Sequence, residues 1–141
     1  MTFVKHSIDA GTAEKAVAAA AKKATELGLK MCIAVVDEAG DLKAFVRMDG
    51  APKLSIQISQ DKAYTAAAYS VATHSWFEFI KDDPPLLHCI THTPRLVVFG
   101  GGFPIMLEGE MVGAIGVSGG HYSQDMECAR AGLAAIGADA L

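Results

Sequence analysis

The order of regular elements along this 141-residue chain predicts an α+β fold. Three observations support the prediction: an alanine-rich helical segment comes first, apolar β-branched runs are joined by short turns, and a helical segment comes last. Since short turns join antiparallel neighbours, we expect a mainly antiparallel sheet of five strands flanked by helices. No internal repeat or composition break divides the sequence, so residues 1–141 are expected to form a single domain.

Three helical segments are predicted, over residues 12–27, 55–72 and 123–136. The first is rich in alanine, glutamate and lysine and stops at Gly28, and its candidate caps are Ser7, Asp9 and Thr12. The second has apolar residues at helical spacing, and the third has an acidic first turn that suits the helix dipole. Residues 74–94 lack a clear period and are expected to form an irregular connection or lid.

Five strands are predicted, over residues 30–37, 42–48, 95–99, 103–107 and 110–117. Each is a short apolar run bounded by turn-forming residues. The turn at residues 38–41 joins the first two strands into a hairpin, and Glu108 with Gly109 joins the last two.

Composition and charge argue against a nucleic-acid or membrane partner and against secretion. The formal net charge is −4 and no run of lysine or arginine occurs, so we expect no nucleic-acid and no membrane partner. The chain lacks the apolar core of a signal peptide, and its three cysteines occur in unrelated contexts, which predicts reduced thiols in the cytoplasm. Hydrophobic residues make up 51% of the chain, so part of the apolar surface is expected to be an interface in a homo-oligomer.

Two glycine clusters, at residues 100–102 and 116–120, are the densest unusual feature. Glycine permits positive φ and lets backbone N–H groups converge on a ligand, although each cluster alone is equally compatible with a tight turn. Two clusters in one small domain, with Ser118 inside the second and Asp125 close behind it, favour a small-molecule pocket. Neither cluster has the order of a phosphate-binding or dinucleotide-binding loop.

Charged residues near these clusters are candidates for chemistry. Arg47 could clamp a ligand carboxylate, or it could pair with Asp49 or Asp37 to pin the first hairpin. Lys62, in an alanine-rich helix, could act as an acid or base together with Asp125, or it could be a solvated lysine. The candidate catalytic residues are Lys62 and Asp125, and the candidate ligand-binding residues are Arg47, Asp49, Gly100, Gly101, Gly102, Phe103, Pro104, Ser118 and Gly119.

The five histidines, His6, His74, His88, His92 and His121, raise the question of a metal or haem. His88 and His92 would share a helix face, but no third ligand accompanies them, so we expect no metal site. A single axial haem ligand needs no spacing motif, and haem therefore stays open as a cofactor.

Five segments in order resemble one known family: VVDEAGDLKAFVRMDGA, SQDKAYTAA, FGGGFPI, EGEMVGAIGVSGG and QDMECARAGL. This is the GlcG/HbpS-like family, also called the haem-degrading domain family, which includes the C-terminal domain of PduO-type corrinoid adenosyltransferases. The resemblance runs from about residue 13 to residue 135. It implies a profilin-like fold and assembly into homo-oligomers, often tetramers or octamers.

The resemblance also implies a range of functions, because some members bind or degrade haem and many accompany bacterial operons for organic-acid, diol or aromatic-compound catabolism. We expect an accessory protein of such a pathway, in which Arg47 and the amides of residues 100–102 bind a small carboxylate. Lys62 or Asp125 could then catalyse a cofactor-free isomerisation or hydration. Two alternatives stay open: a haem-binding or tetrapyrrole-binding module that uses a histidine and the apolar residues 76–79, and a non-catalytic stabiliser of a neighbouring enzyme.

Overall fold

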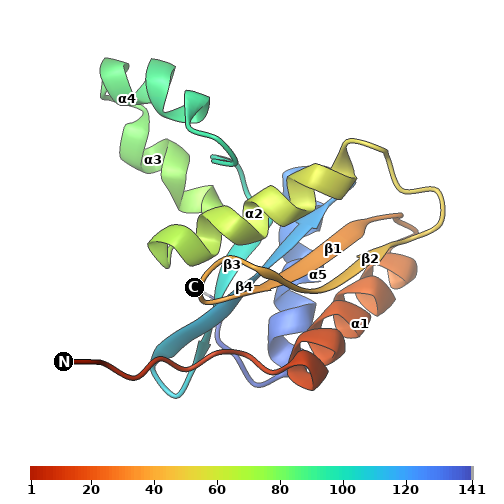
Figure 1. Ribbon diagram of the computed structural model, residues 1–141. Coiled ribbons are helices and arrows are strands. Elements are labelled where there is room, and N and C mark those ends of the chain that lie inside the picture. The colour runs from red at the N-terminus through yellow and green to blue at the C-terminus, as the bar shows by residue number, and fades with distance from the viewer. Residues whose placement is uncertain (141) are drawn as a thin grey trace.

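A computed structural model of the chain, which describes residues 1–140, confirms the α+β fold (Figure 1). Four antiparallel strands form one sheet in the order β2-β1-β4-β3, with helix α2 on one face and helices α1 and α5 on the other. The strands are β1 (Cys32–Asp37), β2 (Leu42–Arg47), β3 (Gly102–Leu107) and β4 (Glu110–Ser118). The long helices are α1 (Ala10–Glu26), α2 (Ser55–Tyr69) and α5 (Tyr122–Ala135).

The two helices on the α1–α5 face begin at side-chain caps. Asp9, one of the three candidate caps, accepts a hydrogen bond from the backbone N–H of Thr12 at 2.7 Å. Helix α5 begins one residue earlier than predicted, because the His121 side chain caps it and Gln124 accepts the His121 N–H at 3.0 Å. Both helices pack their small residues against the larger core side chains of the sheet.

The opposite face of the sheet is lined by small residues, which lets helix α2 approach closely. Ala34 and Ala114 on the strands meet Ala63 and Ala66 on the helix. A Cβ on Gly116 would lie 2.0 Å from the backbone oxygen of Ser59, so only glycine fits at this position. The backbone of helix α2 therefore lies close to the backbone of strand β4.

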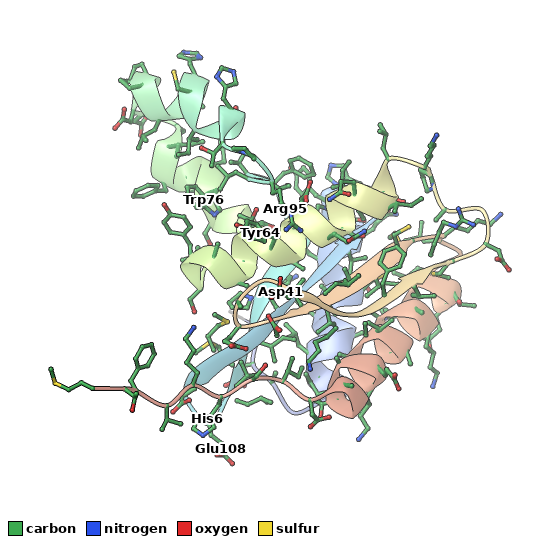
Figure 2. All side chains as sticks on the ribbon, in the orientation of Figure 1. His6, Asp41, Tyr64, Trp76, Arg95 and Glu108 are labelled. Carbon is green, nitrogen blue, oxygen red and sulfur yellow. The ribbon has the colours of Figure 1, made fainter. Side chains whose placement is uncertain are left out.

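The prediction of five strands was wrong, because residues 95–99 form no strand. This segment binds helix α2 instead of a neighbouring strand: the Thr65 hydroxyl donates to the Arg95 carbonyl at 2.9 Å and accepts the Val97 N–H at 3.0 Å. Arg95 has a φ of 68°, its Nε donates to Asp61 at 2.9 Å, and its guanidinium lies 4.0 Å from the Tyr64 ring centroid (Figure 2). The Thr65 side chain thus satisfies backbone groups of residues 95–99 that would otherwise have paired with a neighbouring strand.

Residues 74–94 are also more regular than predicted. They contain η1 (Thr73–Ser75), α3 (Trp76–Ile80), α4 (Pro84–Cys89) and η2 (Ile90–His92). Together, residues 73–92 form a helical projection that stands away from the sheet (Figure 1). Nowhere in residues 1–140 is a helix long and apolar enough to span a bilayer.

Candidate functional site

A buried ion pair joins three elements at one end of the sheet. The Nζ of Lys62, on helix α2, lies 2.7 Å from Oδ2 of Asp125, on helix α5, and their side chains are 0% and 3% exposed. The same Nζ donates to the carbonyl oxygen of Val117 on strand β4 at 2.9 Å. The two candidate catalytic residues, 63 positions apart in the sequence, are therefore in direct contact.

Burial changes the proton affinity of both members of this pair. Desolvation lowers the pKa of Lys62, and the neighbouring Asp125 charge opposes this shift. Desolvation also raises the pKa of Asp125, against the opposing charge of Lys62. Since the two pKa values approach each other, transferring a proton from Lys62 to Asp125 costs less free energy than the same transfer between separate groups in water.

The first glycine cluster forms a turn directly on Lys62. Gly101 has a φ of 127°, and a Cβ there would lie 2.6 Å from the Lys62 Nζ and 2.7 Å from the Val117 oxygen. The Gly102 N–H donates to the hydroxyl of Thr73 at 2.9 Å and is therefore not available to a ligand. Gly100 and Gly101 are buried residues, and neither N–H donates a hydrogen bond to any group within residues 1–140.

The second glycine cluster holds the other member of the pair. The N–H of Gly120 donates to Oδ1 of Asp125 at 3.1 Å, so both carboxylate oxygens accept a hydrogen bond. Gly119 has a φ of 143°, and a Cβ there would lie 2.6 Å from the Lys30 oxygen. Ser118 is a buried residue at the end of strand β4. This cluster positions Asp125 and packs against the backbone that precedes strand β1.

A cavity of about 410 Å³ lies beside the first glycine turn. It is lined by His74, Phe77, Glu78, Val98, Phe99, Gly100 and Tyr122, and we call it the Phe99 cavity. The Phe99 ring centroid lies 5.0 Å from the Lys62 Nζ, so this lining residue also contacts the ion pair. The lining offers aromatic surface for an organic ligand and an imidazole for a polar contact.

His74 is the polar side chain of the Phe99 cavity with the most unusual surroundings. Its Nδ1 is buried and has no hydrogen-bond partner within residues 1–140. Burial lowers the pKa of His74, and the positive charge of Arg130 lowers it further. The imidazole is therefore neutral near pH 7 and able to accept a hydrogen bond or bind a metal ion.

Arg47 and Asp49 lie away from this site. Arg47 is on strand β2 and pairs with Cys32 on β1, which in turn pairs with Ser118 on β4. Gly101 lies on the other side of β4, directly before strand β3, and its carbonyl accepts the Val117 N–H. Three strand spacings of about 4.8 Å put Arg47 about 14 Å from the glycine turn. Both exposed residues line a different hollow of about 580 Å³ together with Lys30. The structure therefore does not bring Arg47 and the glycine amides of one chain to the same small carboxylate.

Two further candidates contribute to the core rather than to the cavity. Phe103 is fully buried in strand β3, with the Arg130 guanidinium 5.2 Å from its ring centroid. Pro104 is buried in the same strand, and neither residue lines the Phe99 cavity. Thr73 and Tyr122 were not predicted as site residues, and Phe99 was predicted only as a strand residue. Phe99 directly precedes the glycine cluster, and this was the available signal.

The described part of the chain, residues 1–140, contains no group of three histidine, cysteine or acidic side chains placed to hold a metal ion. His88 lies on helix α4 and His92 on the η2 turn, both in the helical projection. A single-ligand haem site needs no such group, so the only described histidine that lines the Phe99 cavity, His74, is the relevant candidate there.

The chain is similar to one protein family and to several known proteins. A family model described as haem degrading protein HbpS-like matches residues 8–134. An uncharacterized 15.0 kDa protein from the dhaT-dhaS intergenic region of Citrobacter freundii is 37% identical over 128 residues, which are 90% of either chain. The crystal structure of Klebsiella pneumoniae protein ORFY has a TM-score of 0.91 at 32% identity, covering 98% of this chain and 96% of that chain. A crystal structure of a PduOC:haem complex has a TM-score of 0.88 at 29% identity, covering 95% and 98% of the two chains.

Proposed function

The chain belongs to the HbpS-like family of haem-degrading proteins, as its motifs predicted, and from its site we propose that it binds a small carboxylate-bearing ligand in the Phe99 cavity. The proposed role is that of an accessory protein in the catabolism of an organic acid, diol or aromatic compound. The relative from the dhaT-dhaS intergenic region supports a role linked to the products of neighbouring genes.

The observation behind this proposal is the pair of unpartnered N–H groups at Gly100 and Gly101. Buried backbone N–H groups almost always have an acceptor, and leaving one without a partner costs about 1–3 kcal/mol. A ligand carboxylate is a suitable acceptor for such backbone N–H groups. The aromatic lining of the cavity would then contact the organic part of the ligand.

Acid–base catalysis by Lys62 and Asp125 is the second part of the proposal. Their shifted pKa values favour proton exchange within the pair, and no cofactor is needed for an isomerisation or hydration. Lys62 does not line the cavity and its Nζ lies against the Phe99 ring, so we expect this ring to turn aside before Lys62 reaches a ligand. Ligand binding therefore does not depend on catalysis, and the two parts can be tested separately.

We expect Gly100→Ala to weaken carboxylate binding at least about tenfold, equivalent to the loss of about 1.4 kcal/mol. The added Cβ would lie 2.4 Å from the Met126 sulfur and 3.3 Å from the His74 Cβ, so the Met126 side chain must shift and the wall of the cavity at Gly100 and His74 changes shape. The measurement is calorimetric titration with a panel of small mono- and dicarboxylic acids. Gly109→Ala is the matched control, because a Cβ there meets nothing within 4 Å.

Arg47→Ala distinguishes the two hollows in the same titrations. It should leave the affinity unchanged, because Arg47 lines the other hollow. If binding is lost in Arg47→Ala and kept in Gly100→Ala, the ligand occupies the hollow of Arg47 and the proposal is wrong.

Haem is a second candidate ligand, because a relative with a TM-score of 0.88 has been crystallised as a haem complex. The Phe99 cavity fits this group in two respects: its lining is aromatic, and His74 supplies a neutral imidazole with a buried, unpartnered nitrogen. His74 would be the axial ligand, with Phe77 and Phe99 against the ring system. Bound haem would supply iron for redox or oxygen chemistry.

Haemin titration monitored by absorbance tests this candidate, and His74→Ala is expected to abolish a stoichiometric Soret shift. His88→Ala, in the helical projection, is the matched control and should retain the shift. Burial and the charge of Arg130 lower the His74 pKa from the usual 6.5. Binding through His74 should therefore be lost at a lower pH than binding through an unperturbed histidine. A Soret shift that is identical in His74→Ala would exclude this residue as the ligand.

A further inference from the structure

The helical projection has too little internal packing to be stable by itself. Helices α3 and α4 have five and six residues, and α4 contains no buried residue. Isolated helices of fewer than about 12 residues are marginal in water. In Figure 1 helix α4 stands clear of the sheet, whereas the base of the projection contacts the body, with Trp76 against Tyr69 of helix α2 and Thr73 bonded to Gly102 of strand β3. A contact outside the single chain would supply the missing packing.

An aromatic groove marks the base of this projection, where it joins helix α2. The groove has a volume of about 390 Å³ and is lined by Tyr69, Val71, Ser75, Trp76 and Phe79. Tyr69 and Phe79 are 62% and 71% exposed, and their rings meet Trp76 edge-on at centroid distances of 5.0 and 6.1 Å. Two large aromatic side chains at this groove are thus left in water.

Trp76 gives the groove a hydrogen-bond donor that has no acceptor. The residue is only 5% exposed, yet its Nε1–H has no acceptor among residues 1–140. A buried indole N–H normally has a hydrogen-bond partner. The groove therefore fits an occupant that offers both an apolar side chain and a carbonyl oxygen.

The N-terminal segment, Met1–Ser7, has the complementary properties. It extends away from the body in Figure 1, and its backbone forms no hydrogen bond with the backbone of residues 1–140. The first such bond is made by the N–H of Ile8, which donates to the Val112 carbonyl at 2.9 Å. Phe3 and Val4 are 79% and 83% exposed. The segment thus presents free carbonyl oxygens next to exposed apolar side chains.

We propose that the N-terminal segment of one copy docks in the aromatic groove of a second copy. Phe3 packs against Tyr69 and Phe79, and a carbonyl of the segment accepts the Trp76 indole N–H. Lys5 of the segment then meets the exposed carboxylates of Asp82 and Asp83 on the partner's projection. Since every copy carries both surfaces, a reciprocal exchange closes a dimer without leaving either surface free.

This docking also affects the ligand cavity, because helix α3 lies between the two hollows. Trp76 and Phe79 line the groove, whereas Phe77 and Glu78 line the Phe99 cavity. Docking of the segment would hold helix α3, and with it one wall of the cavity. The proposal depends on no particular ligand, so it can hold or fail independently of the proposed function.

Trp76 is the only tryptophan in the chain, so its fluorescence reports on the groove directly. Phe3→Ser is expected to raise the dissociation constant of the oligomer at least about tenfold in analytical ultracentrifugation and to shift Trp76 emission to longer wavelength. Tyr69→Ser should have the same effect on association, and the double variant should add little to either single change. Leu54→Ser, at a site 77% exposed outside both surfaces, should change neither reading.

A peptide with the sequence of residues 1–7 provides a test in trans, with far-UV circular dichroism to show that each variant is folded. Adding it to the Phe3→Ser chain should restore the short-wavelength emission. An oligomer that is unchanged in both Phe3→Ser and Tyr69→Ser would overturn the proposal. So would a wild-type chain that is monomeric at all concentrations, or an emission shift in Phe3→Ser at concentrations where the wild type is monomeric, since the segment would then dock in its own chain.

Discussion

Lys62→Met is expected to lower the free energy of unfolding by about 3–5 kcal/mol, because it leaves the Asp125 carboxylate buried without its cation. The Lys62 side chain is fully buried, and its ammonium binds Asp125 and the Val117 carbonyl at 2.7 and 2.9 Å. Methionine fills a similar volume but donates no hydrogen bond. Urea unfolding followed by circular dichroism measures the loss.

Two companion variants show whether this loss comes from the ion pair. Lys53→Met changes an exposed lysine just before the same helix and should cost less than about 0.5 kcal/mol. Adding Asp125→Leu to Lys62→Met removes the unpaired charge and should recover part of the loss, since apolar replacement of a whole buried pair is often tolerated. If Lys62→Met costs no more than Lys53→Met, the pair does not hold helices α2 and α5 together.

The sequence predicted most of the fold because its elements are locally encoded. Apolar runs and the turn residues between them identified the hairpin of β1 and β2 and the hairpin of β3 and β4. Residues 95–99 have the same apolar composition but bind a threonine on helix α2. A short apolar run shows that a segment is partly buried, not what it packs against, and this is why the fifth strand was wrong.

The residues of the site were predicted better than the contacts between them, because those contacts depend on tertiary packing. Lys62 and Asp125 were both candidates, and the glycine clusters indicated where the backbone is crowded, but their contact depends on packing between elements 63 residues apart. Arg47 was grouped with the glycine amides because its guanidinium could clamp the same ligand carboxylate. The strand order β2-β1-β4-β3 separates them, and nothing in the local sequence predicts that order.

The depth at which helix α2 packs on the sheet is what lets Lys62 reach Asp125, and Gly116→Ala is expected to disturb it. The added Cβ would lie 2.0 Å from the Ser59 oxygen and 2.5 Å from the Ala63 nitrogen, both backbone atoms, so the helix itself must move. We expect the free energy of unfolding, measured in urea, to fall by about 3 kcal/mol.

The matched control for this change is Gly109→Ala, in the turn between strands β3 and β4. Its φ of 80° strains an alanine, but no atom lies within 4 Å of the new Cβ, so we expect a loss of about 1 kcal/mol from backbone strain alone. The excess loss in Gly116→Ala then measures the displacement of helix α2. If the two variants lose equal stability, helix α2 can lift from the sheet without cost, and the buried ion pair cannot depend on this close contact.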